Sequence, residues 1–197
     1  MNVQVKIVKG EGIKPYIKDL ARLRMELFRD FPYLYDGSSE YEEEYLSVYL
    51  RSKDAIIVLA LDGEQVVGAS SGMPMSMESD EVKAPFVHTE LAPDKIFYFG
   101  ESLLMKAYRG RGIGHKFFDE RESHAKMLKR FSHTAFCAVV RPDDHPERPV
   151  GYAPLDPFWI KRGYTRRSDL VTSFSWQDLN ENGESLKPMV FWIREIR

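Results

Sequence analysis

The chain has 197 residues, of which 43% are hydrophobic, so it is long enough to bury one substantial core. We expect residues 1–197 to form a single domain. The 28 Lys and Arg residues nearly balance the 30 Asp and Glu residues, and the formal net charge of -2 gives no general attraction to nucleic acid or to an anionic membrane. The only cysteine, Cys137, excludes an intramolecular disulfide and a cysteine-cluster metal site.

The sequence also argues against a membrane protein and against a metal site. No apolar run approaches the roughly 20 residues that span a bilayer, and the N-terminus lacks the basic and apolar regions of a signal peptide. We therefore expect a cytoplasmic protein with no membrane and no nucleic-acid partner. The five histidines include no pair at metal-binding helical spacing, so no metal is predicted.

The first half of the chain predicts a strand, two helices and a hairpin. Apolar and polar residues alternate over 3–7, as in a half-buried strand. Apolar residues recur every three or four positions over 17–31 and 39–49, which predicts two helices. An Asp-Gly turn joins the β-prone runs 55–61 and 65–71, so these two strands should be antiparallel neighbours.

The second half alternates regular elements with irregular, proline-containing segments. Residues 73–94 are too irregular for one element and predict an excursion from the sheet. The predicted elements are then a strand, a helix, a strand, a short helix and a terminal hairpin, over 95–105, 112–130, 134–140, 155–162, and the pair 170–176 and 189–196. This order predicts an α+β fold, an α/β sandwich with a mixed sheet and helices on its faces.

The segment 109–114, Arg-Gly-Arg-Gly-Ile-Gly, lies between a predicted strand and a predicted helix. Its glycines allow positive φ, and the free N–H groups of the first helical turn suit a phosphate or pyrophosphate. An ATP-binding P-loop would have Lys and Ser or Thr directly after the last glycine, where His115 and Lys116 stand. A dinucleotide fingerprint would need a glycine at Phe117.

This segment matches the Arg/Gln-x-x-Gly-x-Gly/Ala signature of the GNAT superfamily of N-acetyltransferases, which the chain resembles over essentially its full length. Residues 158–164 resemble the aromatic helix of the family and its Gly-aromatic end, and 189–192 resemble its closing strand. The resemblance implies a mainly antiparallel central sheet of about seven strands flanked by about four helices. It also implies an acyltransferase that uses acetyl-CoA as co-substrate.

The resemblance further implies where coenzyme A would lie. The strand before the loop would present backbone groups to the pantetheine arm, and the loop amides would hold the pyrophosphate. Splaying of the strands over 95–105 and 134–140 would open the slot for the thioester. The predicted cofactor-binding residues are Leu103, Leu104, Met105, Arg109, Gly110, Arg111, Gly112, Ile113, Gly114 and Phe158.

Direct acyl transfer to an amine needs a general base, because an alkylamine with a pKa of about 10.4 is mostly protonated at neutral pH. Glu101 is the first candidate, since many family members carry a carboxylate on this strand; a carboxylate merely hydrogen-bonded beside the cleft is the alternative. The usual acid Tyr falls at Trp159, whose indole is no proton source. Tyr152 and Tyr164 are substitutes by sequence, although either could be a packed aromatic. The thiolate could also leave without help.

The acceptor amine is not specified by the sequence. Aromatic residues over 31–36, followed by Glu40 and the glutamates 42–44, would suit a cationic amine, unless the aromatics are core and the glutamates a solvated face. The insertion over 78–90 could also reach the site. A small-molecule or peptide amine therefore remains open, as does a homodimer through Phe191 and Trp192.

Two other functions compete with an acyltransferase. A non-catalytic acyl-CoA-binding or sensing module is suggested by Trp159. A serine esterase is suggested by Ser70, which stands in a Gly-x-Ser-x-Gly segment, although no helix follows to complete the required turn. Cys137 could form an acyl-cysteine, but a buried small hydrophobe is the commoner role.

Overall fold

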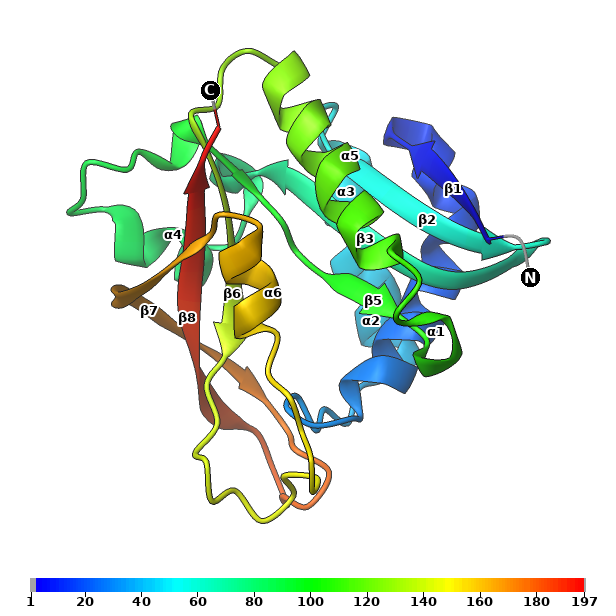
Figure 1. The fold of residues 1–197 in the computed structure, drawn as a ribbon, viewed down its shortest axis with the longest axis vertical. Coiled ribbons are helices and arrows are strands. Elements are labelled where there is room, and N and C mark those ends of the chain that lie inside the picture. Colours follow the sequence, from blue (N-terminus) through cyan, green and yellow to red (C-terminus); the bar gives the residue numbers. More distant parts are fainter. Residues whose placement is uncertain (1–2, 197) are drawn as a thin grey trace.

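A computed structural model describes residues 3–196, which form one mixed, eight-stranded sheet with helices on its faces (Figure 1). The strand order is β1-β2-β3-β4-β6-β8-β7, and β5 pairs with β3. Only β4 and β6 pair in parallel, while the other pairs are antiparallel. The α+β architecture predicted from the sequence is therefore confirmed.

The strands are β1 Val3–Val8, β2 Ile56–Asp62, β3 Gln65–Pro74, β4 Ile96–Tyr98, β5 Ser102–Leu104, β6 His133–Val139, β7 Thr165–Trp176 and β8 Ser185–Glu195. The helices are α1 Ile17–Phe28, α2 Ser39–Leu46, α3 Val48–Arg51, α4 Asp80–Lys83, α5 Ile113–Met127 and α6 Asp156–Lys161. None of these helices, within residues 3–196, is long and apolar enough to cross a membrane.

The continuous apolar run of β2 reflects burial on both faces of the sheet. Val58 belongs to the apolar cluster of Phe117 on α5, while the next residue, Leu59, belongs to the cluster of Leu20 on α1. Successive side chains of a strand point to opposite faces. Helix α5 therefore covers one face of this half of the sheet, and α1 with α2 covers the other (Figure 1).

The predicted strand over 95–105 is interrupted, so the prediction of one continuous element is wrong. β4 ends at Tyr98, and the chain resumes as β5 at Ser102 with β3 as its partner. A Cβ on Gly100 would lie 2.2 Å from the Tyr49 hydroxyl oxygen, so the chain passes here only without a side chain. The N–H of Glu101 donates to the Ser71 hydroxyl at 3.1 Å instead of continuing a strand ladder.

Other boundaries differ less from the prediction. The first helix ends at Phe28, and the second predicted helix is divided at Ser47 into α2 and α3. The excursion over 73–94 is confirmed, with β3 continuing to Pro74 before a series of short turns. Both strands of the terminal hairpin are longer than predicted, because β7 begins at Thr165 and β8 at Ser185.

Candidate active site

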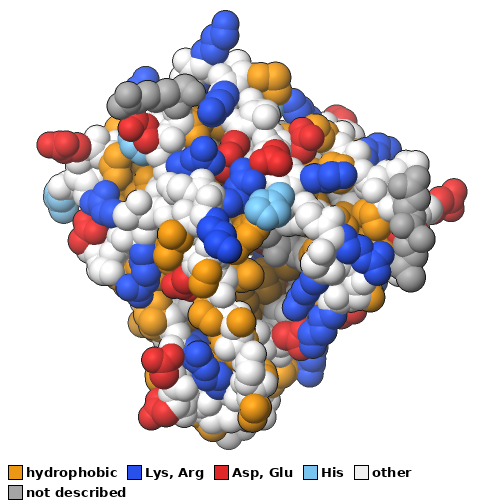
Figure 2. Space-filling view, viewed as in Figure 1, with side chains coloured by type: hydrophobic (Ala, Val, Ile, Leu, Met, Phe, Trp, Pro, Cys, Tyr) orange, Lys and Arg blue, Asp and Glu red, His pale blue; other side chains and the backbone are white. Residues whose placement is uncertain are grey.

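The sheet divides where the strand pairing of β4 with β6 ends. The parallel pairing stops at Tyr98 and Ala135. Beyond this point β5 stays with β3, and β6 stays with β8. Within residues 3–196, each of these two strands thus has one edge without a strand partner here, and the splaying implied by the resemblance is confirmed. The strands β3 and β5 thus belong to one arm of the sheet, and β6 and β8 to the other. Figure 2, viewed as in Figure 1, shows a hollow between these two arms, with hydrophobic side chains on its walls.

The turn that leads from β5 into α5 has the geometry that anion binding requires. Gly110 and Gly112 have φ of +76° and +77°, a region that L-residues rarely adopt. Helix α5 begins at Ile113, and its first N–H groups have no intrahelical carbonyl partners. The helix dipole adds positive potential at this end.

Two predicted cofactor residues support this turn. The guanidinium of Arg109 donates to the Leu104 carbonyl at 3.0 Å, which ties the turn to the end of β5. Phe158 of α6 lies over the first turn of α5, with its ring centroid 4.9 Å from that of His115. A Cβ on Gly114 would meet only this Phe158 ring, at an ordinary 3.8 Å. The residues predicted from the loop, from β5 and at Phe158 therefore lie in one region.

Glu101 lies in the break between β4 and β5 and is only 6% exposed. Its Oε2 accepts a hydrogen bond from Arg24 Nη1 at 2.9 Å, and Arg24 Nε donates to Glu42. Burial raises the pKa of the Glu101 carboxyl, while the positive charge of Arg24 opposes this shift. A carboxylate with a raised pKa is better matched to proton transfer near neutral pH.

The ion cluster of Arg24, Glu42 and Glu101 contains two carboxylates and one guanidinium. Arg24 also stacks on aromatic rings, with Cζ 4.4 Å from the centroid of Tyr45 and 5.0 Å from that of Phe28. Glu42 is fully buried, so the interpretation of these glutamates as a solvated face is wrong for this residue. Oε1 of Glu42 has no hydrogen-bond partner among the described residues. The cluster is therefore suited to a cationic ligand.

A second buried arginine, Arg121 of α5, holds the break from the opposite face. Its Nη1 donates to the carbonyl oxygens of Ser71 and Glu101, at 3.0 and 3.2 Å. Its Nε donates to the Phe117 carbonyl at 3.1 Å, and its Nη2 to the Ser102 hydroxyl at 2.8 Å. Arg121 thereby ties α5 to β3 and to the backbone at the start of β5.

The two candidate acid tyrosines lie in different surroundings. Tyr164 is 2% exposed, and its hydroxyl donates to Glu122 at 3.2 Å and lies 2.9 Å from the Thr134 hydroxyl. Burial and the neighbouring Glu122 raise its pKa. Tyr152 is half-buried in the loop before α6 and packs edge-on against Phe31, with 4.7 Å between ring centroids. The packed-aromatic alternative therefore describes both tyrosines in this structure.

Trp159 belongs to an aromatic layer between α6 and the C-terminal strands. Its ring centroid lies 5.0 Å from that of Phe136 and 5.1 Å from that of Trp192. Trp192 and Phe191 are themselves at most 2% exposed. Their side chains are therefore not accessible to a second subunit, and the structure gives no support for a dimer contact through these two residues. A homodimer itself stays a prediction.

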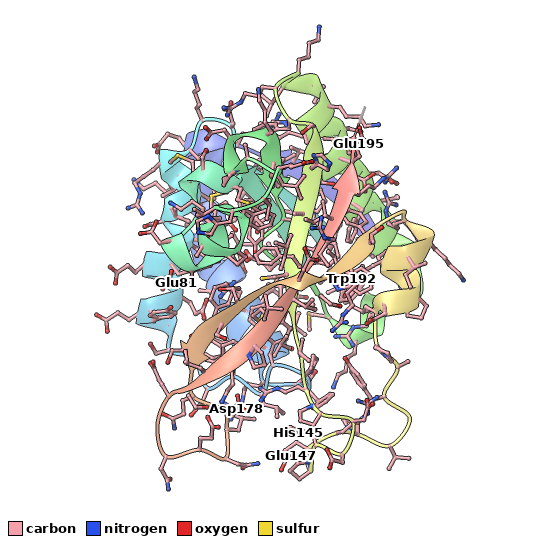
Figure 3. The ribbon with its side chains drawn as sticks, turned by 90° about the vertical axis from the view of Figure 1, so that its left-hand side faces the viewer. Glu81, His145, Glu147, Asp178, Trp192 and Glu195 are labelled. Carbon is pink, nitrogen blue, oxygen red and sulfur yellow. The ribbon has the colours of Figure 1, made fainter. Side chains whose placement is uncertain are left out.

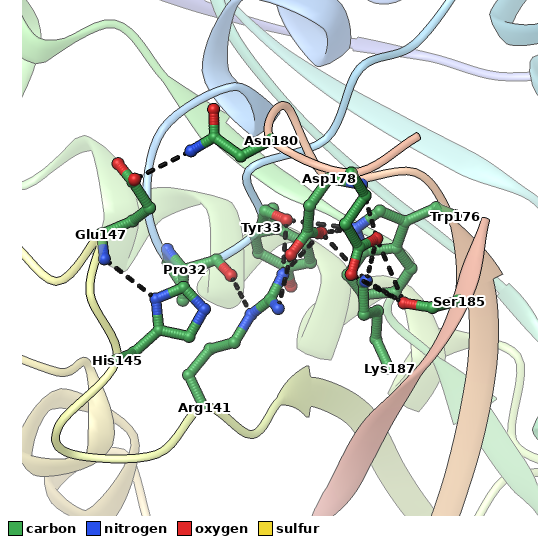
Figure 4. A network of polar contacts seen from close by, with 11 residues as sticks. Pro32, Tyr33, Arg141, His145, Glu147, Trp176, Asp178, Asn180, Ser185 and Lys187 are labelled. Atoms are coloured by element: carbon green, nitrogen blue, oxygen red, sulfur yellow. Dashed lines mark hydrogen bonds and ion pairs between the residues drawn. The ribbon is translucent and has the colours of Figure 1, made fainter. Parts of the chain in front are cut away.

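The loop between α1 and α2 crosses to the other arm of the sheet and is fastened there (Figure 4). Arg141 binds Asp178 through both Nη atoms, at 2.7 and 2.9 Å, and also donates to the carbonyls of Pro32 and Tyr33. Trp176 Nε1 donates to the same Tyr33 carbonyl and to Asp178. We call the contacts of Arg141, Asp178 and Trp176 with this loop the loop clamp.

A cavity of about 210 Å³ lies beside the loop clamp. Figure 3 shows His145, Glu147 and Asp178 together at this end of the molecule. Its walls are Leu34, His145, Pro146, Glu147, Asp178, Leu179, Asn180 and Glu181. Asn180 donates to Glu147 across it at 2.8 Å. Three segments distant in the sequence thus meet here, around the loop clamp.

The two other nucleophile hypotheses are not supported. Ser70 is fully buried in the middle of β3, where it pairs with Val58 and Ser102, so the strand-turn-helix of an esterase is missing and that hypothesis is wrong. Cys137 is buried, and its sulfur lies 3.1 Å from the Tyr98 hydroxyl. Burial raises the pKa of this thiol to about 12, which suits a packed residue.

Sequence reasoning missed Arg24, Arg121 and Ser102. One signal was present: Arg24 lies four residues after Leu20, and Arg121 four residues after Phe117, so each arginine stands on the apolar face of its helix. A charged residue in such a position is almost always paired when it is buried. Nothing in the local sequence distinguishes Ser102.

The sequence matches no protein-family model and no curated protein. Solved structures, by contrast, match along the whole chain. Ribosomal-protein-alanine N-acetyltransferase from Brucella melitensis is 13% identical with a TM-score of 0.62, covering 98% of this chain and 99% of its own. YncA from Salmonella typhimurium, solved with its cofactor acetyl-CoA, is 8% identical with a TM-score of 0.62, covering 100% and 95%.

A eukaryotic structure matches equally well. Arabidopsis thaliana NAA60, in complex with a bisubstrate analogue, is 11% identical with a TM-score of 0.61, covering 98% of this chain and 99% of its own. Likeness at this level of identity establishes the fold. The chain has the fold of the GNAT acetyltransferases over its full length.

Proposed function

We propose that the protein is an acyl-CoA-dependent N-acyltransferase that transfers an acetyl group from acetyl-CoA directly to a primary amine. One observation carries this proposal: the strand that forms one wall of the divided sheet, β5, leads through a single 3-10 turn over Lys106–Tyr108 into the glycine-rich turn before α5. A ligand with a pyrophosphate at this turn would have its arm beside the free edge of β5. An acyl-CoA thioester has both parts, a pyrophosphate and a long pantetheine arm that carries the acyl group.

The residues of the binding site follow from this placement. Backbone groups of Leu103, Leu104 and Met105 would bind the pantetheine arm. The amides of the turn 109–114 would bind the pyrophosphate, with positive charge from Arg109 and Phe158 packed alongside.

Glu101 is our proposed general base. Its carboxylate is buried beside the break in the sheet, with a raised pKa and, within residues 3–196, one ion-pair partner, Arg24. A neutral amine that attacks the thioester carbonyl would pass its proton to Glu101, directly or through water. We assign neither Tyr152 nor Tyr164 as the general acid. Tyr152 packs against Phe31, and the Tyr164 hydroxyl would first have to break its hydrogen bond to Glu122.

The acceptor we propose is an amine that arrives as a cation, on the face of the sheet that carries α1 and α2. The cluster of Arg24, Glu42 and Glu101 supports this, because its carboxylates outnumber its guanidinium. One structural neighbour is named for a protein acceptor, ribosomal-protein alanine. A peptide N-terminus and a small-molecule amine are both retained, and a cytoplasmic location stays our prediction.

Calorimetry with acetyl-CoA tests the site. Gly114 is the position to change, because its helical backbone accepts a side chain and a Cβ would meet only Phe158. Gly114→Glu should abolish binding by placing a carboxylate at the pyrophosphate position. Gly12→Glu is the control, since Gly12 also has open space around it but lies in the N-terminal segment.

Thiol release from acetyl-CoA in the presence of an amine panel then tests catalysis. The panel should include spermidine, an aminoglycoside and a peptide with an N-terminal alanine. Binding with amine-dependent release supports the transferase. Binding without release by any amine favours the non-catalytic module suggested by Trp159, and no binding by the native protein would exclude both.

A further inference from the structure

The site described above has a base but no group to stabilise the sulfur that leaves the thioester. In transfer to an amine, a C–N bond forms at the carbonyl carbon and the C–S bond breaks, leaving the electron pair on sulfur. The amine proton goes to Glu101 or to water. A hydrogen-bond donor at the edge of the slot would stabilise the developing thiolate.

Ser102 lies at this edge. It is the first residue of β5, directly after the break, and its side chain is exposed. Its backbone is fixed by pairing with Ser70 of β3 on one side. The other edge of β5 faces β6 across the divided sheet (Figure 1).

The hydroxyl of Ser102 has a defined direction because of Arg121. Arg121 Nη2 donates to the Ser102 oxygen at 2.8 Å, and a guanidinium can only donate. One lone pair of the hydroxyl is therefore occupied, and its own proton must point to another acceptor. Arg121 is 1% exposed, and its other hydrogen bonds go to backbone carbonyls, so Ser102 is the side chain to which this guanidinium donates.

Arg121 keeps its charge at neutral pH. Burial lowers its pKa, but only to about 10. Its guanidinium also lies 4.1 Å from the ring centroid of Phe99 and 4.9 Å from that of Phe118, which holds it in place between α5 and the break. A hydroxyl bound to a fixed cation is a stronger hydrogen-bond donor than a free one.

We propose that Ser102, oriented and polarised by the buried Arg121, donates a hydrogen bond to the sulfur that leaves the thioester. This inference rests on the proposed acyl-CoA transfer. Ser102 contacts the reacting group and Arg121 is its positioning residue. The thiolate leaves with its electron pair, accepts this hydrogen bond, and takes its proton from solvent.

Hydroxylamine is the probe for the test, because it is a small nucleophile that is largely unprotonated at neutral pH and needs neither the natural acceptor nor Glu101. Ser102→Ala should lower kcat for hydroxylamine-dependent thiol release from acetyl-CoA by about 10- to 100-fold, as loss of a transition-state donor does. KM and the calorimetric Kd for acetyl-CoA should stay within about twofold. Ser102→Thr keeps the hydroxyl and should restore most of kcat.

The matched control is Ser168→Ala. The Ser168 hydroxyl also accepts from an arginine, Arg166, at 3.0 Å, but it lies on β7, which β8 separates from β6. This variant should have native kcat. An unchanged kcat in Ser102→Ala, or a loss that Thr does not restore, would overturn the role of Ser102 alone. Failure of the native protein to release thiol would instead overturn the proposed function.

Discussion

Arg24 of α1 and Glu101 at the break in the sheet form a buried ion pair, with 2.9 Å between Nη1 and Oε2 and side chains only 11% and 4% exposed. Arg24 pairs with the equally buried Glu42 as well. One guanidinium thus connects α1, α2 and the break, and its loss would leave two carboxylates without a counter-charge.

Arg24→Met should therefore lower the free energy of unfolding by about 3–5 kcal/mol, since removing one partner of a buried pair leaves an uncompensated charge. Urea denaturation measures this. The control is Arg29→Met, because Arg29 and Asp36 form an exposed pair, 55% and 46% exposed, whose loss should cost less than about 1 kcal/mol. Equal costs for both variants would contradict the importance of the buried cluster.

Glu101→Gln keeps the size of the side chain and much of its hydrogen bonding but removes the proposed base. We expect kcat/KM for an alkylamine acceptor to fall by about 100-fold or more. The rate with hydroxylamine should change far less, because that nucleophile needs little deprotonation. A parallel loss with both nucleophiles would show that Glu101 has a structural role only.

Glu78 should make stability depend on pH. Burial raises the pKa of its carboxyl from 4.5 to about 7, and Oε1 has no hydrogen-bond partner within residues 3–196. The folded state therefore binds the proton more tightly than the unfolded state, so stability falls as the pH rises from about 4.5 to 7, by no more than about 3 kcal/mol. Glu78→Gln should remove this part of the slope in unfolding experiments across that range. An unchanged slope would mean that Glu78 ionises normally.

Gly100→Ala should destabilise the break. The added Cβ would lie 2.2 Å from the Tyr49 hydroxyl and 2.6 Å from the Ser71 hydroxyl, and overpacking of this kind typically costs about 1–3 kcal/mol. Tyr49→Phe removes the nearer oxygen, so the double variant should recover part of the loss. Additive losses in the two single variants and the double variant would argue against this steric cause.

The loop clamp should control local rather than global stability. Arg141→Met removes the bonds to Asp178 and to the loop carbonyls, so amide exchange should accelerate at Leu179 and Asp36, whose N–H groups bind Leu34 and Gln177 across the same contact. Arg148→Met is the control, because its partner Asp143 is 98% exposed. No acceleration at these two amides would mean that the backbone bonds alone hold the loop.

The sequence predicts the features that depend on neighbouring residues. The turn 109–114 is one, because its glycines, its position before a helix and its helical N–H groups are all local, and the structure has Gly110 and Gly112 at positive φ. The break at Gly100 is different. It depends on Tyr49 and Ser71, which reach this position only in the folded chain, so 95–105 looks like one strand.

The candidate catalytic residues show the same limit. The resemblance to a known family points to Glu101 through the strand on which it lies. The partner of Glu101, Arg24, is 77 residues away in the sequence, so no local pattern predicts their contact. Ser102 has no distinguishing local pattern, and only the approach of α5 sets its hydroxyl against Arg121. Long-range contacts of this kind fix the chemistry of a site, whereas periodicity reports only which face of an element is buried.

The divided sheet, joined at one end by the β4–β6 pairing, is also bridged at its wide end, where Tyr35 pairs with Asp178 and Arg141 binds Asp178 and the Tyr33 carbonyl. The opening between the two arms of the sheet is therefore a window that is closed by contacts at both ends. Two reactants that enter this window from opposite faces of the sheet would reach the same point. The acyl donor and the amine would then meet without sharing an entrance, and neither product would have to pass the other on its way out.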